Sequence, residues 1–163
     1  MKKILFIILM AMPCMVFAQK FGYINTQEVF AQMPDVKIVQ SKLDSIGKSY
    51  ENQIASMREE LARKYQEYQE QQSTMTDALK QLKEQEIYDM QQRSQTFVQQ
   101  VQQDYERQQQ ELLAPVHEKL SSAIKKVGEE KGFTYIFDSA AMVYIAPDAV
   151  NVAPDVKAKL GIK

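Results

Sequence analysis

The side chains that most often carry out chemistry in proteins are sparse in this chain and do not cluster. His117 is the only histidine and Cys14 the only cysteine, so imidazole and thiolate ligands are too few for a transition-metal site. The five glycines are isolated, and no glycine-rich loop is present to bind a phosphate group. The carboxylates are many, but Glu60 and Lys64 are i,i+4 partners of the kind found on a solvated helix face. The sequence therefore predicts a protein that is not an enzyme and that uses no metal or cofactor.

Methionine and tyrosine side chains in the middle of the chain favour binding over catalysis. Both are adaptable or amphipathic, which suits a surface that contacts varied partners. Most of them fall on one helical stripe, where they would hold two helices together. Four apolar residues lie off the stripe or at the tip of the helical arm predicted below. They are our candidates for partner contact: Ile38, Met75, Val98 and Leu113.

Residues 1–18 have the pattern of a cleaved export signal. A basic start is followed by an apolar run from Ile4 to Met12 and then by small and medium-sized residues up to Ala18. The run is shorter than the ~20 residues that a membrane-spanning helix needs, which argues against an anchor. The residues before Cys14 are a poor match to a lipoprotein signal. We expect cleavage after Ala18.

Loss of this signal would leave a chain without cysteine and with 18 Lys and Arg against 21 Asp and Glu, a formal charge of about −3. A nucleic-acid-binding protein should be clearly basic, so we expect no nucleic-acid partner. No second apolar stretch is long enough to span a bilayer, and the mature chain is expected to be soluble.

The long polar stretch between Pro34 and Pro115 has the composition and periodicity of a helix. It is rich in Gln, Glu, Lys, Met and Leu and contains no proline. Disorder is the alternative for such a polar tract. However, apolar residues, with a few tolerated polar ones such as Gln72 and Ser94, recur every three or four positions from Val36 to Leu82 and again from Ile87 onward, which is typical of a helix stripe.

These stripes belong either to one long helix that pairs with another chain or to a hairpin. The hairpin is favoured because stripe positions match about a centre near residue 75, so that Tyr68 would pair with Leu82. The segment 73–77, STMTD, holds the only dense group of Ser, Thr and Asp in the tract, and these residues cap helices and favour turns. We therefore predict a helical arm over residues 36–115 with its tip near 73–77.

The two ends of the chain predict short strands and helices. Asn25 to Glu28 has the pattern of a capping box that begins a short helix. Pro154 and Gly161 frame another short helix near the C-terminus. Aromatic and β-branched content predicts strands at residues 20–24, 133–138 and 142–145.

Residues 19–35 and 116–163 would then form a small body at the base of the arm, giving an α+β fold. Three strands from about 65 residues bury little surface and leave the edges of a sheet open. We therefore expect an oligomer that completes the sheet between subunits, although these features alone do not fix the number of subunits.

A signal peptide, a short strand and a long helical hairpin precede the C-terminal segment "GFTYIFDSAAMVYIAPDAVNVAPDVKAKL". In this order and in this segment the chain resembles the Skp/OmpH family of periplasmic chaperones. The C-terminal segment is the more specific part of the resemblance, which covers essentially the whole mature chain.

The resemblance implies a homotrimer in the periplasm that acts without ATP. Three bodies would form a β-rich trimerisation domain, and three arms would enclose a cavity that holds unfolded outer-membrane β-barrel proteins and prevents their aggregation. A structural coiled-coil tether or adaptor of the cell envelope is the alternative function. The resemblance places these residues at the subunit interface: Phe21, Tyr23, Ile24, Tyr135, Phe137, Val143 and Ile145.

The chain also departs from the family pattern in two places. Residues 70–90 carry two lysines against five carboxylates, whereas the best-known members have basic arms that attract lipopolysaccharide. We therefore do not extend lipopolysaccharide binding to this chain. Ala153 stands where a Ser or Thr helix cap is usual, so we expect a different entry into the last helix.

Overall fold

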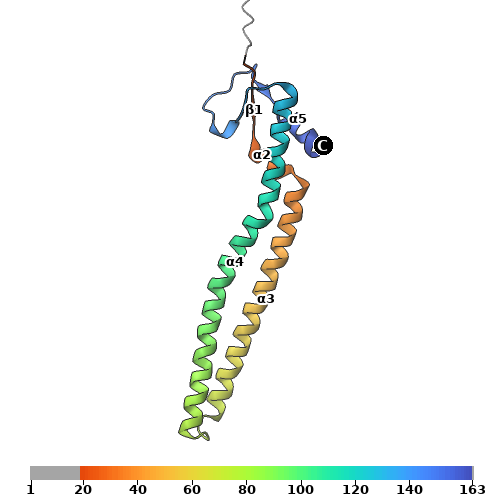
Figure 1. The fold of residues 1–163 in the computed structure, drawn as a ribbon. Coiled ribbons are helices and arrows are strands. Elements are labelled where there is room, and N and C mark those ends of the chain that lie inside the picture. The colour runs from red at the N-terminus through yellow and green to blue at the C-terminus, as the bar shows by residue number, and fades with distance from the viewer. Residues whose placement is uncertain (1–18, 163) are drawn as a thin grey trace, which may run out of the picture.

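The computed structural model describes residues 19–162, and the predicted signal peptide lies outside this range. The predicted α+β fold is confirmed, because a small body carries a long projecting pair of helices (Figure 1). The elements in chain order are β1 (Phe21–Ile24), α2 (Thr26–Gln32), α3 (Pro34–Gln71), α4 (Asp77–Lys131), β2 (Tyr135–Asp138), the 3-10 helix η1 (Ser139–Ala141), β3 (Val150–Asn151) and α5 (Ala153–Leu160).

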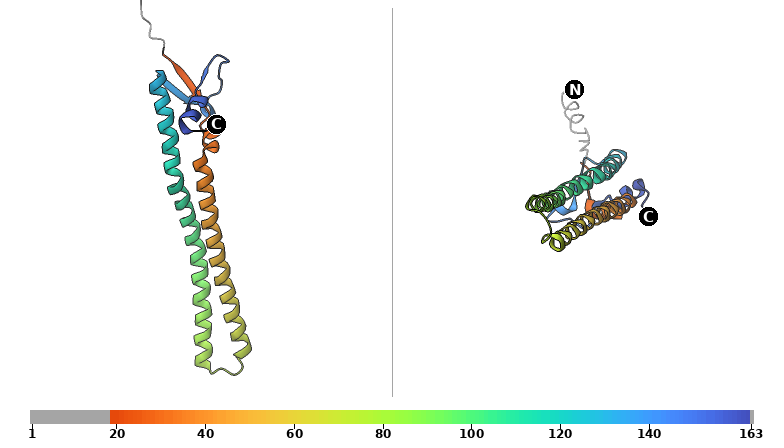
Figure 2. Two further views of the ribbon diagram at one scale, coloured as in Figure 1. Left: turned by 90° about the vertical axis from the view of Figure 1, so that its right-hand side faces the viewer. Right: turned by 90° about the horizontal axis from the view of Figure 1, so that it is seen from below.

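Helices α3 and α4 form an antiparallel hairpin, as predicted, and not one continuous helix. They run side by side over the length of the arm (Figure 2). The turn between Gln71 and Asp77 falls on the segment that the sequence marks as the tip. The Thr76 side chain accepts a hydrogen bond from the Leu79 amide at 3.4 Å, so Thr76 is the cap of the return helix.

Helix α4 carries the arm into the body without a break. It continues through Pro115, which has no N–H to donate to the carbonyl of Glu111. The helix survives this loss because Val116 and the turns that follow are buried in the body. It ends at Gly132, whose φ of 66° is the left-handed conformation that glycine adopts at a helix C-terminus.

The sheet has the strand order β2-β1-β3, and both outer strands are parallel to β1. Phe21 lies opposite Tyr135 and Tyr23 opposite Phe137, so one face of the β1–β2 pair is aromatic. On the other face Gly22 allows close packing, since a Cβ there would lie 2.9 Å from Val152 Cγ1. The connection from β1 to β2 contains the whole arm, so the sheet joins the two ends of the hairpin.

The strand predicted at residues 142–145 is wrong. This segment has no strand pairing, and Val143 is 105% exposed. The second edge of β1 pairs instead with β3, where Gly22 lies opposite Val150. β3 takes this place because Val152, directly after it, is fully buried and its amide donates to the Tyr23 carbonyl at 2.9 Å. Apolar content alone did not reveal which segment had a core to pack against.

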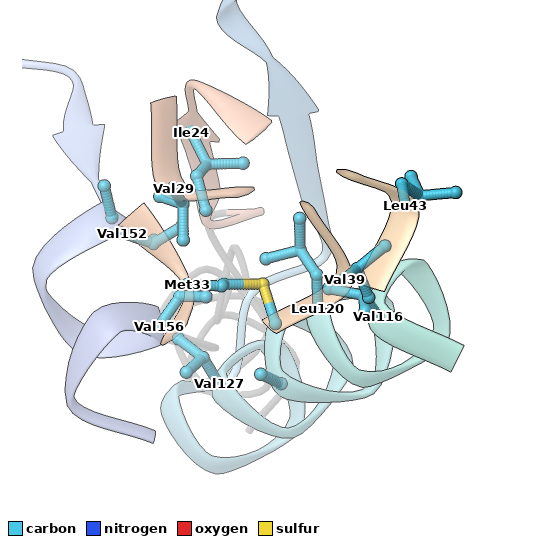
Figure 3. Packing of buried hydrophobic residues seen from close by; sticks show 12 residues of the cluster. Ile24, Val29, Met33, Val39, Leu43, Val116, Leu120, Val127, Val152 and Val156 are labelled. Atoms are coloured by element: carbon cyan, nitrogen blue, oxygen red, sulfur yellow. The ribbon is translucent and has the colours of Figure 1, made fainter. Parts of the chain in front are cut away.

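Twelve apolar residues from the strands and helices of the body and from the base of the arm form one buried cluster (Figure 3). Met33, in the connection between α2 and α3, is fully buried between the α5 and α4 side chains Val156 and Leu120. The cluster therefore holds the sheet, the two short helices and the start of the hairpin together. Its members are Ile24, Val29, Met33, Val39, Leu43, Val116, Leu120, Ala123, Val127, Val152, Ala153 and Val156.

Both short helices begin with a cap that the chain sequence explains. The Asn25 side chain accepts from the Glu28 amide at 3.0 Å, as predicted for α2. Helix α5 has Val152 at its cap position without a side-chain bond, and the Asn151 side chain instead accepts from the Ala153 amide at 2.9 Å. This is the altered entry expected from the absence of Ser or Thr at position 153.

Candidate functional site

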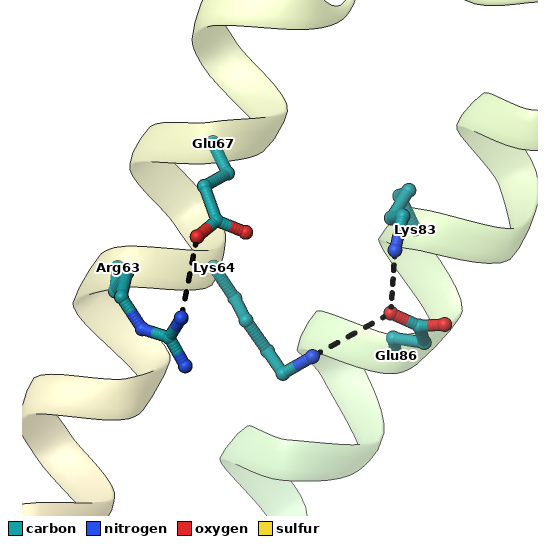
Figure 4. Close-up of polar contacts among 5 residues, drawn as sticks. All are labelled: Arg63, Lys64, Glu67, Lys83 and Glu86. Atoms are coloured by element: carbon teal, nitrogen blue, oxygen red, sulfur yellow. Dashed lines mark hydrogen bonds and ion pairs between the residues drawn. The ribbon is translucent and has the colours of Figure 1, made fainter.

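Polar contacts across the arm fix the alignment of its two helices. The hydroxyl groups of Tyr50 and Tyr68 donate hydrogen bonds to the carboxylates of Asp104 and Glu84. Between these two pairs along the arm, Lys64 of α3 lies 3.7 Å from Glu86 of α4 (Figure 4). These pairs agree with a fold of the chain about a centre close to residue 75, as the stripe predicted.

Hydrogen bonds in the arm shift the pKa values of several of these groups. The hydrogen bond from Tyr50, together with Arg107, lowers the pKa of Asp104, and Asp104 in turn raises the pKa of Tyr50. Lys83, which donates to Glu86 at 3.1 Å, likewise lowers the pKa of Glu86. Asp104 and Glu86 therefore stay ionised and Tyr50 stays protonated near neutral pH, so none of these three groups is prepared for proton transfer. These groups act as structural contacts of the arm.

The stripe predicted at the start of α4 is wrong by one position. Leu82 is 55% exposed and Leu79 is also exposed, whereas Lys80 and Lys83 are half-buried towards α3. Lysine can take such a position because its aliphatic stem packs while its ammonium group reaches a carboxylate, here Glu86. The predicted partner of Tyr68 was Leu82, and the structure replaces it with Glu84.

The four residues predicted to contact a partner do not form one patch. Ile38 is exposed in a groove of about 350 Å³ beside Pro115, at the base of the arm. Val98 is exposed in a second groove of about 500 Å³ near the middle of the arm. Met75 is half-buried at the tip, and Leu113 is half-buried against the core cluster. The candidates are thus distributed along the arm.

Several exposed apolar side chains were missed by the sequence reasoning. Tyr65, Leu79 and Leu82 fit the three- and four-residue spacing of the predicted stripe but are exposed, as is Tyr88. A stripe drawn through Lys80, Lys83, Ile87 and Met90 has the same helical spacing and matches the face that packs on α3. It would have predicted both leucines to be exposed. The outer half of the arm therefore presents more apolar surface than we predicted.

The body exposes a cluster of three aromatic rings. Phe21 lies 6.0 Å from Tyr135 and 6.3 Å from Phe137, measured between ring centroids, and Tyr135 lies 5.9 Å from Phe137. All three rings are exposed, and so is Val143. Exposed aromatic clusters on a small body usually mark a contact surface.

The other predicted interface residues lie in different surroundings. Tyr23 and Ile145 are half-buried. Ile24 is fully buried within the core of its own chain, on the opposite face of the sheet from the aromatic rings, and presents no surface to a partner.

Groups typical of catalysis are not assembled in the described part of the chain. Residues 19–162 contain no group of three or more His, Cys, Asp or Glu placed to hold a metal ion. His117 stacks on the Phe30 ring at 4.3 Å between centroids, which gives this histidine a packing role. Among the same residues, no helix combines the length and apolarity needed to cross a bilayer.

Comparisons with known proteins agree with this geometry. The family of outer membrane proteins described as OmpH-like matches residues 20–160. The chaperone protein Skp of Pectobacterium atrosepticum is 27% identical over 139 residues, which cover 85% of this chain and 84% of that protein. The chaperone protein Skp of Vibrio cholerae is 26% identical over 132 residues, covering 80% and 78% of the two chains.

The fold has a counterpart among solved structures. A crystal structure of a candidate OmpH-like outer membrane chaperone from Caulobacter crescentus matches with a TM-score of 0.78. The match covers 87% of this chain and 83% of that one at 16% sequence identity, so it concerns the fold alone. Because the family match extends over almost all of the described residues, the chain belongs to the OmpH-like outer membrane protein family, whose curated relatives here are Skp chaperones.

Proposed function

We propose that this protein is an ATP-independent periplasmic chaperone that holds unfolded outer-membrane β-barrel proteins between the arms of a homotrimer. The observation that carries the proposal is the similarity, over about five-sixths of the chain, to proteins that are chaperones and not enzymes. In this proposal residues 1–18 direct export and are removed after Ala18. Residues 36–115 act as the arm, and residues 19–35 and 116–163 form the trimerisation body.

The arm has the properties that a holding chaperone needs. Open grooves and exposed apolar side chains are spread along its length, the side chains including Ile38, Tyr65, Leu82, Tyr88 and Val98. Dispersed contacts of this kind bind an unfolded chain weakly at many points and leave it mobile. Three arms that act together would multiply the affinity of each.

The body supports assembly in a complementary way. The aromatic cluster of Phe21, Tyr135 and Phe137 is continuous with the outer edge of β2, which has no strand partner in the single chain. Burial of this cluster between subunits would remove both the apolar surface and the open sheet edge from water. In this proposal Tyr23, Val143 and Ile145 also take part in the contact between subunits.

The arm does not attract its client by positive charge. Residues 36–115 contain ten Lys and Arg against thirteen Asp and Glu, so the arm is slightly acidic. Electrostatic steering of acidic or lipopolysaccharide-like ligands is therefore not part of this proposal. Apolar and hydrogen-bonding contacts must supply the affinity.

Aggregation of an unfolded client tests the proposal directly. A β-barrel protein diluted from urea should remain dispersed, by light scattering, when an equimolar amount of the mature trimer is present without nucleotide. Aggregation at the same rate with and without the trimer would disprove the holding function.

A variant with a shortened arm distinguishes the proposed chaperone function from the alternative function of a structural tether. Deletion of residues 57–67 and 84–94 removes opposite segments of 11 residues, about three helical turns each, and so nearly preserves the phase of both stripes. The variant should stay trimeric in sedimentation but hold smaller clients or less of each client. An unchanged client capacity would favour the tether.

A further inference from the structure

Four exposed glutamines form a regular row on α4. Gln91, Gln95, Gln99 and Gln103 are spaced four residues apart, and all four are exposed to solvent. Each step of four residues rises about 6.0 Å and turns about 40° around the helix. We call this row the glutamine ladder. It passes gradually around the outer side of α4 as it rises.

The ladder connects the two grooves of the middle arm. Gln91, Gln95 and Gln99 line the groove of about 500 Å³ that also contains Leu61 and Val98. Gln103 lines the groove of about 480 Å³ on the other side of α4. The apolar parts of that second groove are contributed by Tyr50, Phe97 and Val101.

The spacing of the ladder suits an extended polypeptide. In a β-strand, side chains on one face repeat every two residues, or about 6.6–6.8 Å, close to the 6.0 Å rise of the ladder. Each glutamine amide can both donate and accept, as the unpaired backbone of an extended chain requires. The ladder spans about 18 Å from Gln91 to Gln103, the length of five or six extended residues.

The amides of the ladder are free to bind. Neighbouring glutamines are engaged within the arm, since Gln85 donates to Asp89 at 2.7 Å and Gln102 to Glu106 at 2.8 Å. Among residues 19–162, none of the four ladder side-chain amides makes a hydrogen bond of this kind to another side chain. Arg93 is the only charged residue between positions 91 and 103. The two grooves add Arg58 and the ion pair of Arg107 with Asp104, so the ladder itself is uncharged and the charges lie at its margins.

We propose that the glutamine ladder binds unfolded polypeptide in an extended conformation through the backbone of that polypeptide. Apolar side chains of the bound segment would enter the flanking grooves at Val98 and Phe97. This inference rests on the proposed holding function and specifies its chemistry, because the client is recognised by its unpaired peptide groups and alternating apolar residues and not by its charge.

Replacement of all four ladder glutamines by methionine tests this chemistry. Gln→Met keeps the length of the side chain and its helix propensity but removes the amide and adds apolar surface. The matched control changes Gln40, Gln53, Gln69 and Gln81 to methionine, because these are exposed on the same arm and lie outside both grooves. Circular dichroism and sedimentation should show that both variants keep the fold and assembly of the parent.

The affinity for a urea-unfolded β-barrel protein is then measured for the parent and both variants. We expect the ladder variant to bind about 10- to 100-fold more weakly, which corresponds to the loss of several hydrogen bonds. The control variant should bind like the parent. Equal or tighter binding by the ladder variant overturns the inference, since apolar contact alone would then explain the affinity.

Salt dependence provides a second, independent measurement. A neutral hydrogen-bonding surface predicts that the affinity of the parent changes little as salt is raised, whereas binding by charge would weaken steeply. A large loss of affinity in high salt would overturn the inference that the ladder binds its client through neutral hydrogen bonds. If the parent fails to suppress aggregation at all, the holding function itself fails. If the parent succeeds and the ladder variant binds equally well, only the ladder is wrong.

Discussion

Replacement of Tyr135 by threonine should weaken the assembly of this protein without unfolding its body. Tyr135 is 57% exposed in the single chain, and its ring centroid lies 6.0 Å from that of Phe21 and 5.9 Å from that of Phe137. Threonine keeps the β-strand preference of the position but loses the ring. The change therefore removes surface available to a partner and leaves the core of the chain intact.

The size of the effect follows from the area of the ring. An aromatic side chain buries roughly 200 Å², so the exposed part of Tyr135 amounts to about 115 Å². At about 25 cal/mol per Å², covering this area contributes about 3 kcal/mol per subunit, of which threonine retains about a third. The loss of about 2 kcal/mol at each of three equivalent interfaces would weaken a trimer by roughly four orders of magnitude.

Sedimentation velocity over a range of protein concentrations measures this effect. The parent should remain a trimer at concentrations where the Tyr135→Thr variant dissociates, while both keep the same far-ultraviolet circular dichroism. Tyr88→Gln is the matched control, because Tyr88 is 56% exposed but lies on the arm. Identical sedimentation of the parent and of Tyr135→Thr would refute the assignment of the aromatic cluster to an interface.

Four further results are expected. Gly22→Ala should lower the free energy of unfolding by about 1–3 kcal/mol in urea titration, because the new Cβ would lie 2.9 Å from Val152 Cγ1. Gly47→Ala should raise it by about 0.5–1 kcal/mol, since a Cβ in this helix meets Tyr105 at an ordinary 3.8 Å. The hydrogen bond from the Thr26 hydroxyl is the main cause that lowers the pKa of Asp138 in the folded protein. The ionised Asp138 carboxylate therefore stabilises the fold fully above about pH 4, and this stabilisation is lost as the pH falls through the folded-state pKa. The melting temperature of Asp138→Asn should accordingly fall less in acid than that of the parent. In hydrogen exchange, backbone amides at the tip of the arm should exchange first and those of the core cluster last.

The hairpin could be predicted because two independent signals agreed. The stripe positions matched about one centre, and the residues at that centre, from Ser73 to Asp77, are those that cap helices. The phase of the return helix could not be predicted in the same way. It depends on Thr76, which begins α4 and directs Lys80 and Lys83 inward in place of Leu79 and Leu82. Hydrophobicity alone predicts that the two leucines face α3. The turn sets the rotation of α4 about its axis, and this rotation places the two lysines on that face instead.

The failed strand at residues 142–145 has a different cause. A single sequence shows which segments are apolar but not which surface covers them, and Val143 is fully exposed in the single chain. The neighbouring pair Val150–Asn151 looks less like a strand, yet it is held against β1 because Val152 enters the core. A prediction that a residue contacts a partner is least accurate where segments far away in the sequence bury that residue within its own chain. Ile24 is such a case, since core residues from α4 and α5 cover it.

The distribution of burial explains how one chain could combine the assembly and the adaptable binding that we propose. Every buried residue of α3 and α4 lies at or near the body, at Val39, Leu43 and from Val116 onward. Between residues 44 and 115 the inward-facing side chains are only half-buried, and the contacts that align the helices are exposed polar pairs of small net stability. In the proposed chaperone the body would therefore stay folded while the arms bend, separate slightly or repack around different unfolded segments. An arm with a tightly packed apolar seam would be more stable, but its grooves would fit only one ligand shape.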